Sequence, residues 1–340
     1  MSREAGYLIA GALLLLAIWW MMRNARRKRE GVPLDELNPM AAYVPKSGAV
    51  PKTGMPRTAV GRRTRREWTE AEMADLEQRL RPLAAPALRL VNEDPDEPFD
   101  DASAPDATRI GGRPALPAGT TWPRSAAGTP MTFLAQVDLR DVHTHLHSAP
   151  LPRSGMLSFF VHCFPEFAYR PDGGLEAAVL LSAPAQPLQL MEYPADLEPD
   201  GRLAARPVTC RQQLTYPYDH RADVLERMTP EERANMPYRF WFDRNEGTYL
   251  FGYPASGGAA AEEKAEMVAR RARGETLNAE DFEAEDTVYH DHRLLARFAC
   301  EEGWGPEQYL DEEIHFMIHR TDLADGRFER TIAVFSEDGP

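Results

Sequence analysis

The chain has 340 residues and a formal net charge of −14, with 43% hydrophobic and 27% charged residues. This composition is ordinary for a globular protein and excludes disorder throughout the chain. Residues 23–66 hold twelve Lys or Arg against three acids, a net +9, and the first 22 residues sum to zero, so residues 67–340 carry −23. An acidic body of this kind excludes nucleic-acid binding, because phosphate affinity comes from clustered Lys and Arg.

An uncharged apolar run of seventeen residues, Gly6–Met22, stands near the N-terminus. At about 1.5 Å per residue, a helix of this length just crosses a hydrocarbon core. Trp19 and Trp20 stand where indole rings favour the headgroup level, and the basic cluster Arg23–Arg29 marks the cytoplasmic side. We therefore expect a single-pass transmembrane anchor over residues 1–23 in the inner (cytoplasmic) membrane, with the rest of the chain in the cytoplasm. A cleaved signal peptide is the alternative, but its positive charge would precede the apolar run.

Residues 24–67 are expected to form a basic linker, because they are rich in Pro and Gly and have little apolar periodicity. The basic clusters at 23–29 and 62–66 are favourable beside anionic lipid headgroups, so the membrane is an expected partner of the helix and the linker. A topology signal followed by a solvated linker is the simpler interpretation of both clusters. The acidic body favours a protein partner with a basic surface.

Residues 68–340 are expected to form one α+β domain. Thr69 and Glu72 form a capping box, and Met73, Leu76 and Leu80 recur at helical spacing, which predicts a helix over 70–81. Short apolar runs bounded by Pro and Gly then predict strands. The expected strands are 87–91, 131–139, 156–164, 178–181, 189–191, 238–242, 248–251, 294–298, 314–318 and 331–335. Helical insertions are expected at 223–228, from residue 229, and at 259–273.

Three motifs recur in the same order in two parts of the chain. In the first part they are Gly112-Arg113-Pro114, Phe133–Val137 and Leu157–Val161. In the second part they are Gly252-Tyr253-Pro254, Leu294–Phe298 and Ile314–Ile318. The recurrence predicts mostly antiparallel β-sheets from two similar β-rich halves, at about residues 84–200 and 238–337.

The same motifs carry a family resemblance. In the first half the relevant segments are Gly111–Pro117, Trp122-Pro123 and Phe133–Leu139; in the second half they are Gly252-Tyr253-Pro254 and Ile318–Leu323. In this order they resemble the YwqG-like family, a bacterial domain of unknown function. The resemblance covers about residues 82–335 and implies an α+β fold with antiparallel sheets, without an agreed activity, cofactor or substrate. The chain departs from the family pattern where Pro306, rather than Asp, follows Trp304 and Gly305.

Two similar halves would enclose a crevice, and crevices lined by aromatic and a few polar groups are common binding sites. The expected ligand-binding residues are Gly112, Trp122, Gln136, Tyr253 and Trp304. Gln136 places a long amide among apolar residues and must satisfy its hydrogen bonds there. A structural network is the favoured interpretation of this amide, and ligand binding is the alternative.

His143, His145 and His147 alternate after the strand expected at 131–139. If this segment is extended, the three imidazoles project from one face and suit zinc, nickel or copper. A metal-dependent enzyme is therefore the alternative function, although surface histidines in a connecting loop are the favoured explanation of the pattern. The sequence contains no nucleophile elbow, cysteine-nucleophile signature or phosphate-binding loop, so it assigns no catalytic residue and no cofactor. It favours a membrane-tethered cytoplasmic module that binds a protein or another ligand.

Overall fold

The computed structural model describes residues 66–93, 99–163, 167–184, 186–217, 221–254, 261–276, 291–299 and 312–337. The expected anchor at 1–23, residues 24–65 of the expected linker, and Trp304 lie outside this part of the chain. Among the residues that are described, no helix is both long enough and apolar enough to cross a membrane.

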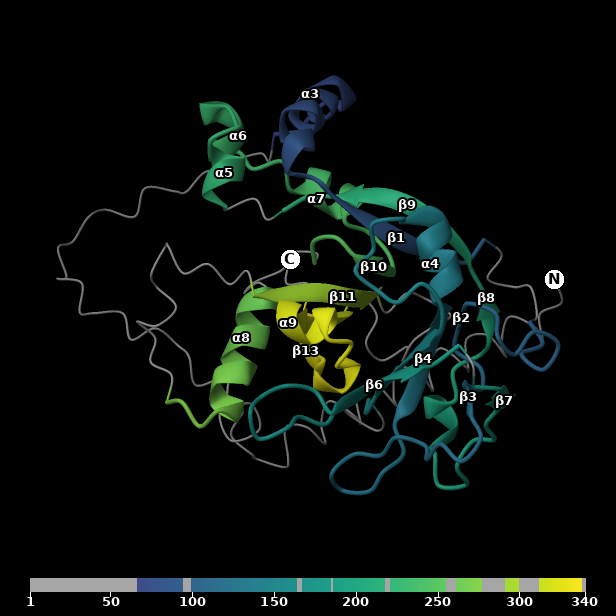
Figure 1. The fold of residues 1–340 in the computed structure, drawn as a ribbon. Helices are drawn as coiled ribbons and strands as arrows, with labels where there is room; N and C mark the ends of the chain where they lie inside the picture. The colour runs from purple at the N-terminus through teal and green to yellow at the C-terminus, as the bar shows by residue number, and fades with distance from the viewer. Residues whose placement is uncertain are drawn as a thin grey trace, which may run out of the picture. The chain divides into compact units, whose positions relative to one another are not determined.

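Six strands form an antiparallel sheet, here named sheet A, in the order β13-β12-β11-β10-β1-β9 (Figure 1). They are β1 (Ala85–Val91), β9 (Thr209–Thr215), β10 (Tyr249–Phe251), β11 (His292–Ala299), β12 (Glu312–His319) and β13 (Ile332–Glu337). The first strand lies inside this sheet, because β1 pairs with β10 on one side and with β9 on the other. The N-terminal part of the described chain is thus an integral part of sheet A.

Five strands form a second antiparallel sheet, sheet B, in the order β6-β5-β4-β2-β8. They are β2 (Arg109–Ile110), β4 (Thr132–Asp138), β5 (Met156–Val161), β6 (Ala177–Ser182) and β8 (Arg206–Pro207), and the short strands β3 (Ala115–Pro117) and β7 (Leu188–Leu190) form a separate pair. The rings of Phe159 in sheet B and of Phe298 and Phe316 in sheet A meet in one core, with centroids 5.2–5.5 Å apart. The two sheets therefore pack face to face, which confirms the mixed fold with mostly antiparallel sheets.

The outer faces of both sheets are also covered. Helix α8 (Ala261–Ala272) packs Ala265 and Val268 against the outer face of sheet A. Leu116 and Trp122 pack against Phe133 and Phe160 on the outer face of sheet B. The other elements are the helices α4 (Leu139–His145) and α9 (Arg320–Ala324), and the 3-10 turns η1 (Arg81–Leu83), η2 (Pro199–Gly201) and η5 (Phe328–Arg330).

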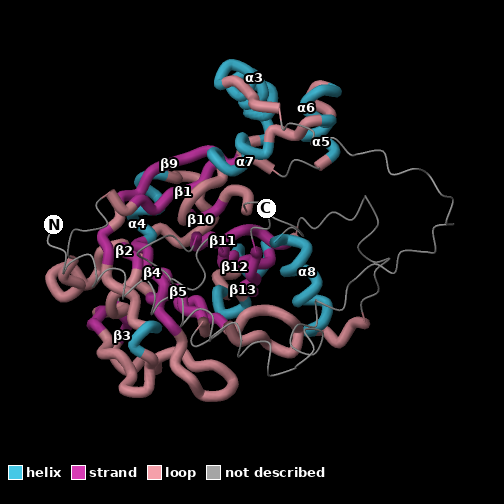
Figure 2. Tube along the Cα trace, turned by 180° about the vertical axis from the view of Figure 1, so that it is seen from behind, coloured by secondary structure: helices cyan, strands magenta, loops and turns pink. Residues whose placement is uncertain are grey.

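Four helices form a helical subdomain at the end of sheet A where β1 begins (Figures 1 and 2). They are α3 (Glu70–Leu80), α5 (Ala222–Leu225), α6 (Pro230–Ala234) and α7 (Tyr238–Arg244). The buried side chains of this subdomain are Met73, Leu76, Leu80, Tyr216, Val224, Met228, Phe240 and Trp241. The capping box of Thr69 and Glu72 starts α3, as the sequence predicts.

One expected strand is wrong: residues 238–244 form the helix α7. Phe240 and Trp241 are buried in the helical subdomain, whereas Tyr238 is half exposed. On the exposed side, Arg239 pairs with Asp243 at 3.2 Å. The two residues are four apart in sequence, which places them one helical turn apart. The aromatic run has high strand propensity, but the burial of Phe240 and Trp241 in the core of the helical subdomain decides the structure. Strands form at the other expected ranges.

The two sheets share a local irregularity. The register of β4 against β5 shifts at Leu134, and that of β11 against β12 shifts at Leu295. Such β-bulges bend a strand and change which side chains face the core. Two residues after each bulge, polar side chains form cross-strand pairs: Gln136 with Ser158, and Arg297 with His315.

A turn with left-handed backbone stands at the end of β2 in sheet B and at the end of β10 in sheet A. Gly111 and Gly112 have φ of +63° and +73°, and Phe251 and Gly252 have φ of +62° and +76°. A positive φ is unfavourable for any residue with a Cβ, and bulky residues rarely adopt it. The buried ring of Phe251 packs in the core between the sheets, and this burial offsets the conformational cost.

We expect Gly111→Ala to destabilise the protein by about 2 kcal/mol more than Gly119→Ala. Both glycines have positive φ, but a Cβ on Gly111 would lie 2.1 Å from the carbonyl oxygen of Ala204, whereas nothing lies within 4 Å of a Cβ on Gly119. Urea unfolding of both variants measures the difference. Equal losses would show that the backbone conformation alone, and not the close approach, determines the cost at Gly111.

Candidate binding site

Gly112 lies in a turn whose polar groups bond to the same chain. Its N–H donates to the carbonyl oxygen of Leu203 at 2.9 Å. The next N–H, of Arg113, donates to the Asp101 carboxylate at 2.8 Å, and the Arg113 guanidinium binds Asp101 and Glu192, each at 2.7 Å. Burial alone would raise the pKa of Asp101, but its bonds to Arg113 outweigh burial and lower it. The glycine motif therefore forms a turn closed by its own ion pair.

The buried amide of Gln136 is occupied by backbone groups. Its Oε1 accepts from the N–H of Ala115 at 2.9 Å, and its Nε2 donates to the carbonyl oxygens of Pro105 at 2.8 Å and Ala107 at 2.9 Å. Arg109, on the neighbouring strand, donates to the same Pro105 oxygen at 2.9 Å. Burial lowers the pKa of Arg109 to about 10. Both polar side chains hold the loop before β2 in place.

Trp122 is an interior side chain. Only 5% of its surface is exposed, and its indole N–H donates to the carbonyl oxygen of Met131 at 2.8 Å. Its ring packs edge-on against Phe160, with centroids 5.6 Å apart, and against Tyr193 at 5.9 Å. Trp122 thus anchors the cover on the outer face of sheet B.

Tyr253 makes its contacts in the other sheet. Its N–H donates to the hydroxyl of Thr215 at 2.9 Å, and its carbonyl oxygen accepts from the hydroxyl of Tyr249 at 2.6 Å. The guanidinium of Arg221 lies 5.4 Å from the centre of its ring. The described members of the expected groove are therefore divided between sheet B, which holds Gly112, Trp122 and Gln136, and sheet A, which holds Tyr253.

The extended conformation on which the metal site depends is not found at His143 and His145, because Asp138 caps a helix, α4, that contains both residues. Residues two apart on a helix point about 200° apart around its axis, so they do not share a face. The ring nitrogens of the three histidines contact separate backbone oxygens. His143 contacts the carbonyl oxygen of Pro152 at 3.0 Å, and His145 contacts that of Asp141 at 3.0 Å. His147 contacts the carbonyl oxygen of His143. In the described part of the chain, no three His, Cys, Asp or Glu side chains are grouped so that they could hold a metal ion.

An open pocket of about 500 Å³ lies at the end of sheet B where β4 and β6 end and β5 begins. We name it the sheet B pocket. It combines two carboxylates and one guanidinium with small hydroxyl and apolar side chains. Its lining residues are Pro105, Asp106, Asp138, Arg140, Ser154, Gly155, Met156, Ser182, Ala183, Pro184, Gln186 and Leu188.

The charged groups of the sheet B pocket differ in how they are held. Asp138 is nearly buried, accepts the N–H of Arg140 at 2.8 Å as a helix cap, and binds the Arg140 Nε at 2.8 Å. Asp106 has 66% of its side chain exposed and lies 3.8 Å from the same guanidinium. Asp106 therefore keeps its oxygens accessible to a cationic group that enters the pocket.

The pocket was not predicted from the sequence. Asp138 belongs to the motif Phe133–Leu139, but its role as a helix cap depends on a helix that follows the strand directly. Asp106 lies in a Pro- and Asp-rich loop that is distant in sequence from Arg140. The Asp-Leu-Arg order at 138–140 is the one local signal, because Asp is a favoured residue before the first turn of a helix.

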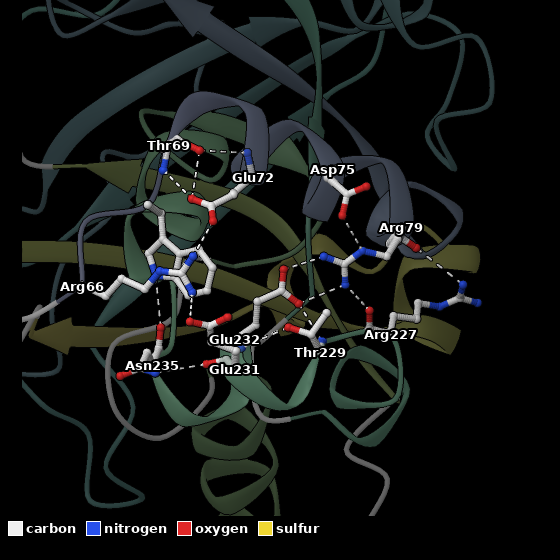
Figure 3. Close-up of polar contacts among 11 residues, drawn as sticks. Arg66, Thr69, Glu72, Asp75, Arg79, Arg227, Thr229, Glu231, Glu232 and Asn235 are labelled. Atoms are coloured by element: carbon white, nitrogen blue, oxygen red, sulfur yellow. Dashed lines mark hydrogen bonds and ion pairs between the residues drawn. The ribbon is translucent and has the colours of Figure 1, made fainter.

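The α3–α6 junction joins the start of the described chain to the helical subdomain (Figure 3). Arg66 pairs with Glu72 on α3 and with Glu231 on α6, and its guanidinium lies 4.0 Å from the centre of the Trp68 ring. The Trp68 indole N–H donates to the carbonyl oxygen of Asn235 at 3.0 Å. These contacts fix the chain on α6 before α3 begins.

A second set of ion pairs at the α3–α6 junction is more buried. Arg79 donates to Glu232 at 3.0 Å and also pairs with Asp75 and with the carbonyl oxygen of Arg227 (Figure 3). Burial alone would raise the pKa of Glu232, but its bonds to Arg79 and Thr229 lower it. The junction thus combines ion pairs with the apolar core of the subdomain.

A buried charged cluster lies beneath α8 on the outer face of sheet A. Arg297 binds Glu313 through two nitrogens, one of them at 3.0 Å, and also donates to the carbonyl oxygen of Gly247. His315 Nε2 lies 3.2 Å from the Glu313 carboxylate. Burial would raise the pKa of Glu313. The positive charge of Arg297 and the hydrogen bonds that Glu313 accepts from His315 and Arg297 outweigh burial and lower this pKa to about 2. Burial lowers the pKa of His315 more than Glu313 raises it.

These shifts predict that acidification destabilises the protein in two stages. Because burial lowers the pKa of His315 in the fold, the unfolded chain takes up a proton at this residue more readily below the ordinary pKa of 6.5, so stability falls as pH drops below 6.5. Glu313 contributes stability above its ordinary pKa of 4.5, which is lost as pH falls from there towards about 2. Urea unfolding between pH 7.5 and 2.5 measures both stages. The variant His315→Gln should flatten the first stage, and an unchanged slope would assign that stage to other groups.

The described cysteines are poor nucleophiles. Burial raises the pKa of the Cys163 thiol and of the Cys210 thiol to about 12 in each case. Both therefore remain protonated thiols at neutral pH, and the thiol form is unreactive. Cys300 lies outside the described residues.

A protein-family model described as a domain of unknown function (DUF1963) matches residues 108–336 of the chain. The match covers most of the stretch on which the sequence resemblance rests. No curated protein matches the chain.

Proposed function

The chain belongs to the DUF1963 family, a domain of unknown function, and we propose that it is a membrane-tethered cytoplasmic binding module. The sheet B pocket carries the binding part of this proposal. It is open, its apolar lining includes Pro105 and Leu188, and its carboxylates offer charge. Its volume lies in the range of ordinary ligand sites, which supports binding of a small ligand or of a protruding side chain of a protein partner.

The partner proposed for the sheet B pocket has a basic surface. The body from residue 67 onward carries −23, so it attracts cations over long range. Within the pocket, Asp106 is the exposed acceptor, while Asp138 is held by Arg140 and the cap of α4. A partner Lys or Arg would thus pair with Asp106 and replace its 3.8 Å contact to Arg140.

The tether is proposed from the sequence. The seventeen apolar residues, the two tryptophans and the basic cluster that follows support a single-pass anchor at residues 1–23 with the body in the cytoplasm. Fractionation of cells that express the full chain, followed by protease treatment from outside, tests this part. Protection of the body, with the chain in the membrane fraction, is expected. Digestion of the body from outside would contradict it.

We also infer that the two sheets contain two copies of one repeated unit, and that the chain is YwqG-like, as the sequence resemblance implies. The strands β2, β4, β5 and β6 follow one another across sheet B in the same order as β10, β11, β12 and β13 across sheet A. The matching bulges at Leu134 and Leu295 and the matching left-handed turns after β2 and β10 support this inference.

Photocrosslinking in cells tests the binding site. A crosslinking amino acid at Gln186, which is exposed and lines the sheet B pocket, is expected to capture a partner, and one at Tyr169, which is exposed elsewhere, is not. Capture at Gln186 should be lost in Asp106→Arg and retained in Asp200→Arg, a matched reversal at an exposed position outside the pocket. Capture that Asp106→Arg leaves unchanged would contradict the site.

A further inference from the structure

The α3–α6 junction contains a complete recognition site for a guanidinium. Arg66 lies over the Trp68 ring and between two carboxylates, those of Glu72 and Glu231 (Figure 3). An aromatic face combined with carboxylates suits Arg better than Lys, because the planar guanidinium stacks and forms several bonds at once. Arg66 is the last member of a basic cluster in the sequence, and it is the first residue of the described chain.

Carboxylates near Arg66 remain accessible. Glu67 is exposed, Glu70 has 87% of its side chain exposed, and Glu231 has 64% exposed. Within the described part of the chain, Glu70 pairs with Arg239 at 3.8 Å, a loose contact on the surface. The first turn of α3 also favours acidic residues, and this face therefore presents negative charge beside the point where the chain enters the subdomain.

We propose that the basic residues immediately before Arg66, namely Arg62, Arg63 and Arg65, dock on this acidic face of α3 and α6. This segment is the expected occupant because of the position of Arg66. Arg66 is held by its two ion pairs, so the residues directly before it in the chain are close enough to reach Glu67, Glu70 and Glu231. The basic cluster at residues 62–66, interpreted from the sequence as part of a topology signal and a solvated linker, then has a second role. It shortens the free linker and fixes the direction in which the chain leaves the body.

This docking does not depend on the sheet B pocket or on its partner. Each exposed ion pair contributes little by itself, and salt screens such pairs strongly. Several pairs together protect the docked segment by roughly tenfold against a reagent that needs it free. Docking is therefore measurable as protection, and it is expected to disappear at high salt.

Limited trypsin digestion of the full chain in detergent tests the proposal. The bond after Arg63 is compared with the bond after Lys52, because a threonine follows both residues and Lys52 lies outside the proposed segment. At low salt we expect cleavage after Arg63 to be about tenfold slower than after Lys52, and the two rates to become similar in about 0.5 M NaCl.

Charge-neutral variants identify the docking face. Glu70→Gln combined with Glu231→Gln should abolish the protection at Arg63, whereas Asp200→Asn, in an exposed turn away from α3, should leave it intact. A thermal melt of each variant confirms that the fold is retained. Equal cleavage after Arg63 and Lys52 at low salt, or protection that survives the double variant, would overturn the proposal.

Discussion

A chain that begins at Asp94 will not fold cooperatively, although it retains the whole stretch that the family model matches. Such a chain lacks α3 and β1. In sheet A, β1 pairs through seven residue pairs with β9 and separates β9 from β10, so its loss leaves β9 without its partner in the sheet. The folding unit therefore extends on the N-terminal side beyond the residues that the family model matches, 108–336, and includes α3 and β1.

The apolar contribution of the deleted residues decides this outcome. Met73, Leu76 and Leu80 belong to the core of the helical subdomain, and Leu88 and Leu90 belong to the core between the sheets. Burial of each such side chain contributes about 1.5–3 kcal/mol, so the five together approach the roughly 5–15 kcal/mol by which a whole domain is stable.

Thermal unfolding followed by circular dichroism measures the effect of this deletion. A chain that begins at Arg62 keeps α3, β1 and the α3–α6 junction and is the matched control, which should melt cooperatively. A cooperative transition at the same temperature in the chain that begins at Asp94 would show that α3 and β1 are accessory to the fold.

Glu313→Leu is expected to destabilise the protein by about 3–5 kcal/mol, because it leaves the buried guanidinium of Arg297 without its carboxylate. Adding Arg297→Leu in the same chain should recover most of this loss. Replacement of a complete buried ion pair by apolar side chains is often close to neutral, whereas removal of one partner leaves an uncompensated charge. Urea unfolding of the single and double variants gives the coupling between the two residues.

An exposed ion pair provides the comparison for this cluster. Glu192 pairs with Arg113 at 2.7 Å but has 81% of its side chain exposed, so Glu192→Leu should cost less than about 1 kcal/mol. If Glu313→Leu and Glu192→Leu cost the same, the charged cluster beneath α8 is solvated and Arg297 is not left as an uncompensated buried charge.

Local signals predicted most of the secondary structure correctly. The capping box at Thr69 marks the start of α3, and the apolar runs of β4, β5, β11 and β12 are long enough to identify buried strands. The polar strand β9 was not predicted, because it lies at the edge of sheet A and its exposed residues show no apolar alternation. The helix α7 was predicted as a strand, since its aromatic residues favour strands when their burial is unknown.

The candidate site was less predictable than the fold. The motif residues attract attention because they are unusual, yet Gly112, Trp122 and Gln136 use their polar groups on the chain's own backbone or on an internal ion pair next to them. The sheet B pocket is assembled from a loop, a helix cap and the ends of three strands. The pairing of β2 with β4 brings Asp106, which precedes β2, close to Arg140, which follows β4, and no local pattern contains that information.

Hydrogen exchange of the full chain, with and without the partner captured through Gln186, tests most directly whether the sheet B pocket is the binding site. If the partner binds there, exchange should slow at the backbone amides of the residues that line the pocket, namely 106, 138, 140, 154–156, 182–183, 186 and 188. Exchange at the glycine turns, residues 111–113 and 251–253, should be unchanged. Protection confined to those turns, with the pocket residues unaffected, would contradict the account.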